Sequence, residues 1–161
     1  MPLVSATRRV AAVTLLSLPL LAAIAFNGAR GLWGADEGRY VDGAIQMLRT
    51  HDWMHVQLNP EYPHYTKPPL TYWTIAASLA LFGKNEFAAR LPNAVAFWGT
   101  SLLLLVAGRI LGMRRPWLPM VVYATTLFPY VAAGVITTDT LLASFTTGAG
   151  VAFLALPAGK G

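Results

Sequence analysis

The sequence contains no cysteine and few charged residues, and these shortages exclude several classes of function. Without cysteine there is no disulfide framework, no thiol nucleophile and no cysteine-ligated metal site. Charged residues make up 12% of the chain, whereas soluble domains usually carry roughly 25%. The net charge is +5, but the basic residues form no single stripe of the kind that binds nucleic acid. We therefore expect no nucleic-acid partner.

Long uncharged runs predict helices that cross a membrane. No Asp, Glu, Lys or Arg occurs in segments 10–29, 91–108, 116–138 and 140–159. A hydrocarbon core about 30 Å thick requires roughly 20 apolar helical residues. We therefore predict an all-α polytopic membrane protein that forms a single transmembrane module over 1–161. Its expected spans are 10–29, 90–108, 116–138 and 140–157.

Basic residues flank alternate ends of these runs and predict the orientation. Arg8 and Arg9 precede the first run, Lys160 follows the fourth, and three arginines separate the second from the third. Lys and Arg near span ends favour the cytoplasmic side. The amino terminus is then cytoplasmic, and the external segment is 30–89. A cleaved signal peptide is the alternative for the first run, but 20 uncharged residues exceed the usual apolar region of about 7–15.

The external segment is expected to contain short helices. Asp36 can cap a helix over 37–50, with a basic residue in its last turn. Asn-Pro and Tyr-Pro pairs within 59–63 indicate turns. Two prolines after Lys67 suit the start of a second helix over 70–82. That helix is short for a span and carries aromatic residues, so we expect it to lie in the membrane interface.

Three positions in the polar regions are candidates for chemistry. Asp36 and Glu37 are paired carboxylates, which can hold a proton, orient an acceptor or bind a cation. The alternative is a helix cap with a second acid that compensates the helix dipole. Lys67 precedes two prolines that restrict its backbone to extended conformations. Its ammonium group is then placed either to hold a lipid phosphate or to anchor the chain at the interface.

Asp139 stands alone between two long uncharged runs. Acids at membrane depth are costly and tend to be functional, although Asp139 could also cap the fourth helix. Arg90 is on the external side with other arginines and could help hold a phosphate, or it could be structural. His51 and His55 have i,i+4 spacing but lack an HExxH frame. We therefore expect no metal site.

Several motifs taken together resemble the amino-terminal part of the bacterial aminoarabinose transferase and related membrane glycosyltransferases. This family is similar to the protein O-mannosyltransferases and implies the multi-span fold of lipid-sugar glycosyltransferases. The order and spacing of the motifs carry the resemblance. Family members are much longer, so we expect this chain to be a fragment of a longer enzyme. The motifs are Asp36-Glu-Gly-Arg-Tyr40, Asp52-Trp53, Tyr65-Thr-Lys-Pro-Pro-Leu-Thr-Tyr-Trp73, Phe87-Ala-Ala-Arg-Leu-Pro92 and Thr138-Asp-Thr-Leu141.

The resemblance implies a role for each candidate residue. Asp36 matches the acid of the first external loop that orients or deprotonates the acceptor, and Glu37 matches its acidic neighbour. Lys67 matches the lysine that contacts the phosphate of a polyprenyl-phosphate donor, and Asp139 matches a second acid facing the same cavity. We expect Asp36, Glu37 and Asp139 to be catalytic and Lys67 and Arg90 to bind donor phosphate.

The expected function is transfer of a sugar from a polyprenyl phosphate to an envelope acceptor, either a lipid A-like glycolipid or a protein. The reaction would be an inverting single displacement at the outer face of the bacterial cytoplasmic membrane, without a cofactor. Membrane lipids are further expected partners. A transporter or flippase is an alternative, but it would place ionisable groups near mid-span. A non-catalytic assembly subunit would explain the short chain but not the combination of motifs.

Overall fold

The structure is a computed structural model that describes residues 2–25, 27–32, 34–59, 62–63 and 67–156. Within these ranges the chain is mostly helical, which confirms the expected class in its coarse form. A short antiparallel hairpin of β1 and β2 was not expected. The elements are α1 (Pro2–Ile24), α2 (Gly34–Thr50), β1 (Gln57–Asn59), β2 (Tyr62–Pro63), α3 (Pro69–Phe82), α4 (Glu86–Ile110), α5 (Leu118–Thr125), α6 (Leu127–Ala133) and α7 (Asp139–Leu154).

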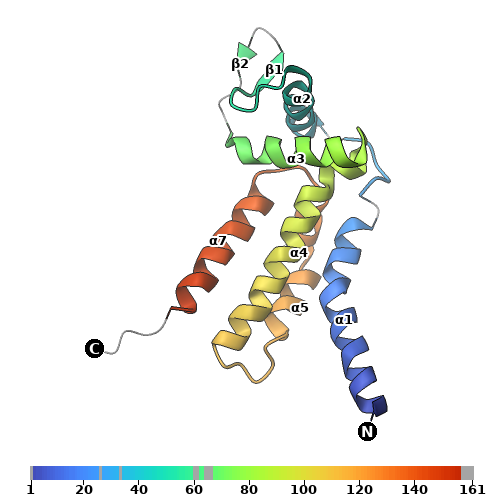
Figure 1. The fold of residues 1–161 in the computed structure, drawn as a ribbon, viewed down its shortest axis with the longest axis vertical. Coiled ribbons are helices and arrows are strands. Elements are labelled where there is room, and N and C mark those ends of the chain that lie inside the picture. The colour runs from blue at the N-terminus through green and yellow to red at the C-terminus, as the bar shows by residue number, and fades with distance from the viewer. Residues whose placement is uncertain (1, 26, 33, 60–61, 64–66, 157–161) are drawn as a thin grey trace, which may run out of the picture.

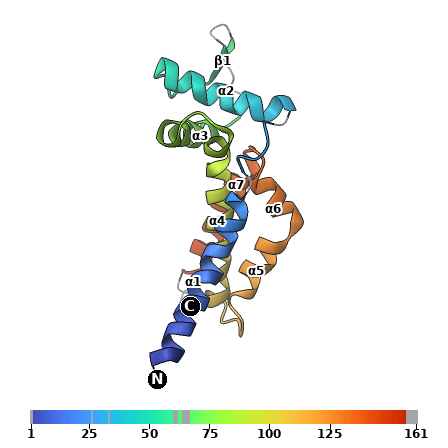
Figure 2. The ribbon, with the colours of Figure 1, turned by 90° about the vertical axis from the view of Figure 1, so that its right-hand side faces the viewer.

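Helix α4 is the axis of the fold. It packs against α1, α3, α5, α6 and α7, and the long helices run side by side while α3 crosses one end of them (Figure 1). Asn85 caps α4 by accepting a hydrogen bond of 2.8 Å from the Ala88 amide. Glu86 in the first turn and Arg109 in the last oppose the helix dipole at either end. Figure 2 shows α2 lying beyond α3 at the same end.

Several observed helices differ in length from the expected spans. Among the described residues, only α4 is both long and apolar enough to cross a membrane by itself. Helix α1 ends at Ile24 rather than 29, and its described apolar part is Val13–Ile24. Helix α7 ends at Leu154, and position 157, where the fourth span was expected to end, lies outside the described residues. The exact number of crossings therefore stays a prediction.

The expectation of one continuous helix over 116–138 is wrong. The chain forms α5 and α6 instead, separated at Thr126, whose backbone is extended with φ −73° and ψ 130°. Pro129 explains the break, because proline has no amide hydrogen to donate to the carbonyl four residues earlier and its ring collides with that carbonyl. The Thr126 hydroxyl instead donates to the Val122 carbonyl at 2.6 Å.

The segment between α1 and α4 forms a small layer in which α2 packs on α3. Buried residues of the two helices, including Tyr40, Ala44, Tyr72 and Ile75, share one hydrophobic core. Helix α2 begins at Gly34, so Asp36 lies inside the first turn and does not cap the helix as expected. Helix α3 lies across the ends of the long helices (Figure 1), which is the arrangement expected of an interfacial helix.

A turn beyond α2 connects this layer to the hairpin. The Asp52 carboxylate accepts hydrogen bonds of 3.0 Å from the amides of Met54 and His55. The His55 backbone and side-chain hydrogen bonds, followed by the Met54 amide, lower the pKa of Asp52 below its usual value. The indole of Trp73 donates to the Trp53 carbonyl at 2.7 Å. This turn is therefore tied directly to α3.

Two glycines of α2 provide a matched test of the α2–α3 contact. A Cβ atom at Gly43 would lie 2.9 Å from two ring carbons of Tyr72, whereas a Cβ at Gly38 would meet nothing within 4 Å. We expect Gly43→Ala to lower the free energy of unfolding by about 1–3 kcal/mol through overpacking. Gly38→Ala should raise it by up to about 1 kcal/mol through helix propensity. Thermal melts would contradict the contact if both variants were equally stabilised.

Candidate active site

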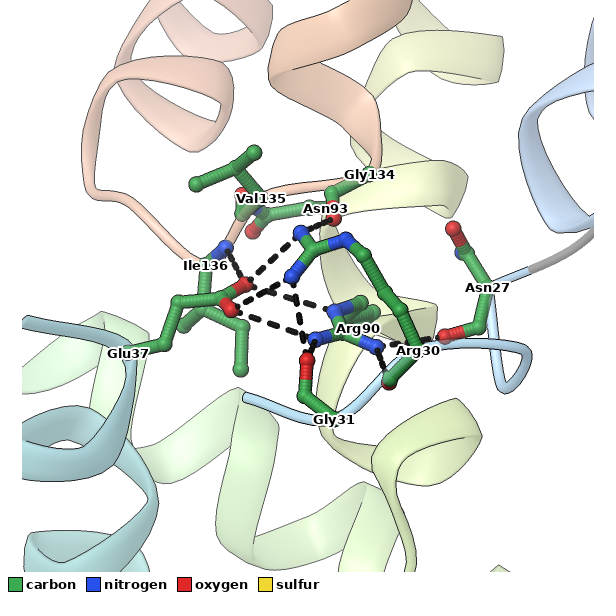
Figure 3. Close-up of polar contacts among 9 residues, drawn as sticks. All are labelled: Asn27, Arg30, Gly31, Glu37, Arg90, Asn93, Gly134, Val135 and Ile136. Carbon is green, nitrogen blue, oxygen red and sulfur yellow. Dashed lines mark hydrogen bonds and ion pairs between the residues drawn. The ribbon is translucent and has the colours of Figure 1, made fainter. Parts of the chain in front are cut away.

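Glu37 is a buried carboxylate at the start of α2, with its side chain 2% exposed. Its oxygens accept hydrogen bonds from Arg30 at 3.0 Å and from Arg90 at 3.1 and 3.3 Å. The Ile136 amide donates a further bond of 2.9 Å. Figure 3 shows these groups converging from α2, α4, the segment after α1 and the segment before α7. We refer to Arg30, Glu37 and Arg90 as the ion-pair cluster.

Arg90 is fully buried and uses all five of its N–H donors within the chain. Two of them bond to Glu37. The others bond to the carbonyls of Asn27 at 2.7 Å, Arg30 at 2.9 Å and Gly31 at 2.8 Å. The guanidinium therefore closes the polypeptide segment after α1 onto α4. These contacts favour the structural role that the sequence left open for Arg90, and binding of a donor phosphate by Arg90 stays a prediction.

The contacts of Glu37 favour a structural role, and its expected catalytic role stays a prediction. Two guanidinium groups and a backbone amide surround its carboxylate, which stabilises the ionised form. A carboxylate in this environment is poorly suited to take a proton from a substrate hydroxyl. Its neighbour Asp36 is exposed and pairs with Arg39 on the surface of α2. The two adjacent acids thus face different surroundings, and only Asp36 is accessible.

The segment 134–137 is held by side chains from three elements. The Gly134 carbonyl accepts a bond of 2.7 Å from Arg30, and the Ile136 amide donates to Glu37. Asn93 of α4 donates to the Val135 carbonyl at 2.5 Å and to the Thr137 carbonyl at 3.4 Å. Figure 3 shows Asn93 and residues Gly134, Val135 and Ile136 of this segment beside the ion-pair cluster. These hydrogen bonds fix the backbone immediately before α7.

Asp139, the first residue of α7, is exposed and lies two positions after the end of this bonded segment. Because Ile136 is bonded to Glu37, the structure places Asp139 and Asp36 at the same end of the molecule. The alternation of spans predicted from the charge pattern likewise puts Asp139 and Asp36 on one face of the membrane. Whether the two carboxylates face one shared cavity stays a prediction.

Lys67 is exposed and precedes α3. The next residue, Pro68, is extended with φ −58° and ψ 141°, and Pro69 begins the helix. The restriction of the Lys67 backbone expected from the two prolines stays a prediction. Residues 64–66, which include part of the motif around Lys67, lie outside the described residues.

An apolar groove of about 500 Å³ lies where α3, α4 and α7 meet. Small residues form part of its lining, among them Ala77, Gly99 and Ser144, and larger apolar side chains such as Val95 and Phe145 complete it. Leu141 also lines the groove, two positions after Asp139. The groove therefore extends from the polar end of the molecule along the surfaces of α4 and α7.

The sequence analysis did not identify the buried residues whose hydrogen bonds hold the backbone around the candidate site. Arg30, Asn27 and Asn93 were not singled out, and a structural role for Arg90 was only one of the two alternatives stated. Their partners are far away in the chain, since Arg90 and Glu37 are 53 positions apart and Ile136 and Glu37 are 99 apart. An available signal was the presence of Arg90 and Asn93 near the start of the predicted span 90–108.

The comparisons with known proteins agree with the motifs. The sequence matches the dolichyl-phosphate-mannose-protein mannosyltransferase family over residues 66–157, which is more than half of the chain. The chain therefore belongs to this family, and the resemblance stated from the motifs is confirmed. The matched region includes Lys67, Arg90 and Asp139, whereas Asp36 and Glu37 precede it.

Individual relatives point in the same direction. The chain is 39% identical over 101 residues to an undecaprenyl phosphate-alpha-4-amino-4-deoxy-L-arabinose arabinosyl transferase of Pseudomonas savastanoi, covering 60% of this chain and 18% of that protein. A protein of the same description from Shewanella sediminis is 32% identical over 97 residues, with the same two shares covered. The chain thus spans less than a fifth of the length of these relatives.

Two solved structures share the fold. The crystal structure of ArnT from Cupriavidus metallidurans in the apo state superposes with a TM-score of 0.84 at 26% identity, covering 97% of this chain and 29% of that one. The structure of the same protein bound to undecaprenyl phosphate gives a TM-score of 0.73 at 25% identity, covering 92% and 28%. This chain therefore has the fold of the corresponding portion of ArnT.

The adjacent acids provide a direct test of the ion-pair cluster. Glu37→Gln would leave the buried Arg90 guanidinium without its counter-charge, and we expect a loss of about 3–5 kcal/mol in the free energy of unfolding. Asp36→Asn removes an exposed acid one position away and should cost no more than about 1 kcal/mol. Thermal melts of the two variants in detergent measure the difference. Equal melting temperatures would refute the structural role of Glu37.

Proposed function

We propose that this chain forms the amino-terminal part of a membrane glycosyltransferase that moves a sugar from a polyprenyl-phosphate donor to an envelope acceptor. The observation that carries the proposal is the placement of two exposed acids, Asp36 and Asp139, at one end of the molecule. The ion-pair cluster holds their backbones there, and the apolar groove starts beside Asp139. Family membership and the relative bound to undecaprenyl phosphate support it.

The donor would occupy the groove and the polar end together. An isoprenoid chain requires an apolar surface, which the groove between α3, α4 and α7 offers. Lys67, on the segment that leads into α3, would contact the phosphate. As the bond between sugar and phosphate breaks, negative charge grows on the phosphate oxygens, and a nearby ammonium group stabilises it. No nucleotide is required for this step.

The acceptor would be activated by an exposed carboxylate. Asp36 is the preferred group, because it is accessible and can accept the proton of the attacking hydroxyl. Asp139 would act as the second acid of the same site. Glu37 would serve as a positioning residue, since its contacts hold the start of α2 and the segment before α7. A single displacement would invert the anomeric carbon.

In the membrane we propose four crossings, formed by α1, α4, the broken pair α5–α6, and α7. The amino terminus would be cytoplasmic, α3 would lie in the outer interface, and the site would face the periplasmic side of a bacterial inner membrane. The buried charges of the ion-pair cluster lie at the ends of α1 and α4 rather than at their midpoints. That placement favours a transferase over a transporter.

Replacing Lys67 tests the donor assignment. In the protein at its native length, Lys67→Ala should lower turnover with polyprenyl-phosphate sugar by roughly 100- to 1000-fold, since one contact to developing charge is lost. Because Lys67 is exposed, the thermal melt should not change. Lys67→Arg should recover part of the activity, and Lys84→Ala, which removes another exposed lysine, should have little effect. Near-normal turnover of Lys67→Ala would mean that Lys67 is only an interfacial anchor.

The absence of cysteine from this chain allows a simple test of the topology. A single cysteine introduced by Arg114→Cys lies in the connection between α4 and α5 and should resist a membrane-impermeant maleimide added to intact cells. Lys84→Cys, between α3 and α4, should react under the same conditions. Both positions are exposed, so accessibility alone cannot explain a difference. Labelling of position 114 from outside would invert the proposed orientation.

A further inference from the structure

The connection between α4 and α5 concentrates positive charge at the end of the molecule away from α2 and α3 (Figure 1). We propose that this basic turn, residues 109–118, binds the phosphate headgroup of an acidic phospholipid. It contains Arg109, Arg114 and Arg115, all exposed. No acidic residue occurs in the sequence between Glu86 and Asp139. Among the residues that the structure describes, none of the three arginines forms an ion pair.

The turn has a defined backbone conformation. Gly112 has a positive φ of 64°, which favours glycine. The Met113 amide donates to the Gly108 carbonyl at 3.0 Å, and the Leu118 amide donates to the Arg115 carbonyl at 3.0 Å. A Cβ atom at Gly108 would lie 2.5 Å from the Pro116 carbonyl oxygen, so only glycine permits this close approach. The arginines are thus presented on an ordered backbone, which reduces the conformational entropy lost on binding.

The surroundings of the arginines match a lipid better than a free anion. An open cavity of about 620 Å³ is lined by Met113, Arg114, Arg115 and Leu118. Exposed apolar side chains flank it, including Leu111 at 60% and Trp117 at 39% exposure. Guanidinium groups bind phosphate through paired hydrogen bonds, and apolar and indole groups suit the boundary between headgroups and acyl chains. A soluble phosphate would leave these apolar groups without a partner.

The basic turn and the proposed donor site near Lys67 lie at opposite ends of α4. Helix α4 has 25 residues and is therefore roughly 37 Å long, enough to extend across a hydrocarbon core of about 30 Å. Its first turn lies near Arg90 and the acids, whereas its last turn carries Arg109. The basic turn would consequently contact the opposite leaflet from Lys67. The inference does not depend on which sugar or acceptor the protein uses.

The experiment measures lipid retention by the protein at its native length. Protein purified in detergent is mixed with phosphatidylglycerol or phosphatidylcholine, and bound lipid is counted by native mass spectrometry. We expect a preference for phosphatidylglycerol that Arg114→Gln/Arg115→Gln weakens by roughly fivefold for each arginine removed. The matched control, Arg49→Gln/Lys84→Gln, removes the same charge from exposed positions at the other end and should keep the preference.

Three further measurements distinguish lipid binding from general anion binding. Raising the salt concentration should weaken the preference of the unmodified protein, since exposed charges are screened. Arg114→Lys/Arg115→Lys retains the charge and should retain much of the preference. Equal weakening in the control variant, or no preference in the unmodified protein, would overturn the proposal. Complete displacement of the lipid by an equal concentration of inorganic phosphate would also overturn it, because the turn would then be a general anion site.

Discussion

The structure depends on one buried electrostatic interaction, between the carboxylate of Glu37 and the guanidinium of Arg90. Neither side chain is more than 2% exposed, and burying an unpaired charge costs several kcal/mol. Here the cost is offset because every N–H of Arg90 has an acceptor and Glu37 also binds Arg30 and the Ile136 amide. The same hydrogen bonds join α2, α4, the segment after α1 and the segment before α7. They therefore hold together the end of the molecule that carries the candidate site.

This arrangement separates the roles of two adjacent acids. Consecutive helical residues point about 100° apart, and α2 uses that difference to bury Glu37 while leaving Asp36 exposed. The buried acid aligns backbones, and the exposed acid remains available to a substrate. Asn93 adds a second support, since its amide holds the segment that leads to Asp139. The proposed chemistry therefore relies on residues that would never contact the substrate.

The two ends of α4 have opposite characters. At its first turn the charges are paired and buried around Arg90, and the apolar groove begins nearby. At its other end Arg109 lies in the last turn, and Arg114 and Arg115 follow in the connection to α5. All three are exposed and lie in a sequence region without acids. In the proposed topology these ends would reach different headgroup layers, in line with the positive-inside tendency of cytoplasmic connections. One helix thus positions a candidate site on one face and a basic turn on the other.

Properties encoded locally were predictable from the sequence. Uncharged runs predicted the helices, the two prolines after Lys67 predicted the start of α3 near its observed position, and the ordered motifs predicted the family. The break at Thr126 also had a local cause in Pro129, although the uncharged run concealed it. The role of Arg90 could not be predicted, because its partners are 53 to 63 positions away. Only tertiary packing decides which charges are buried, since burial depends on segments that the fold brings together.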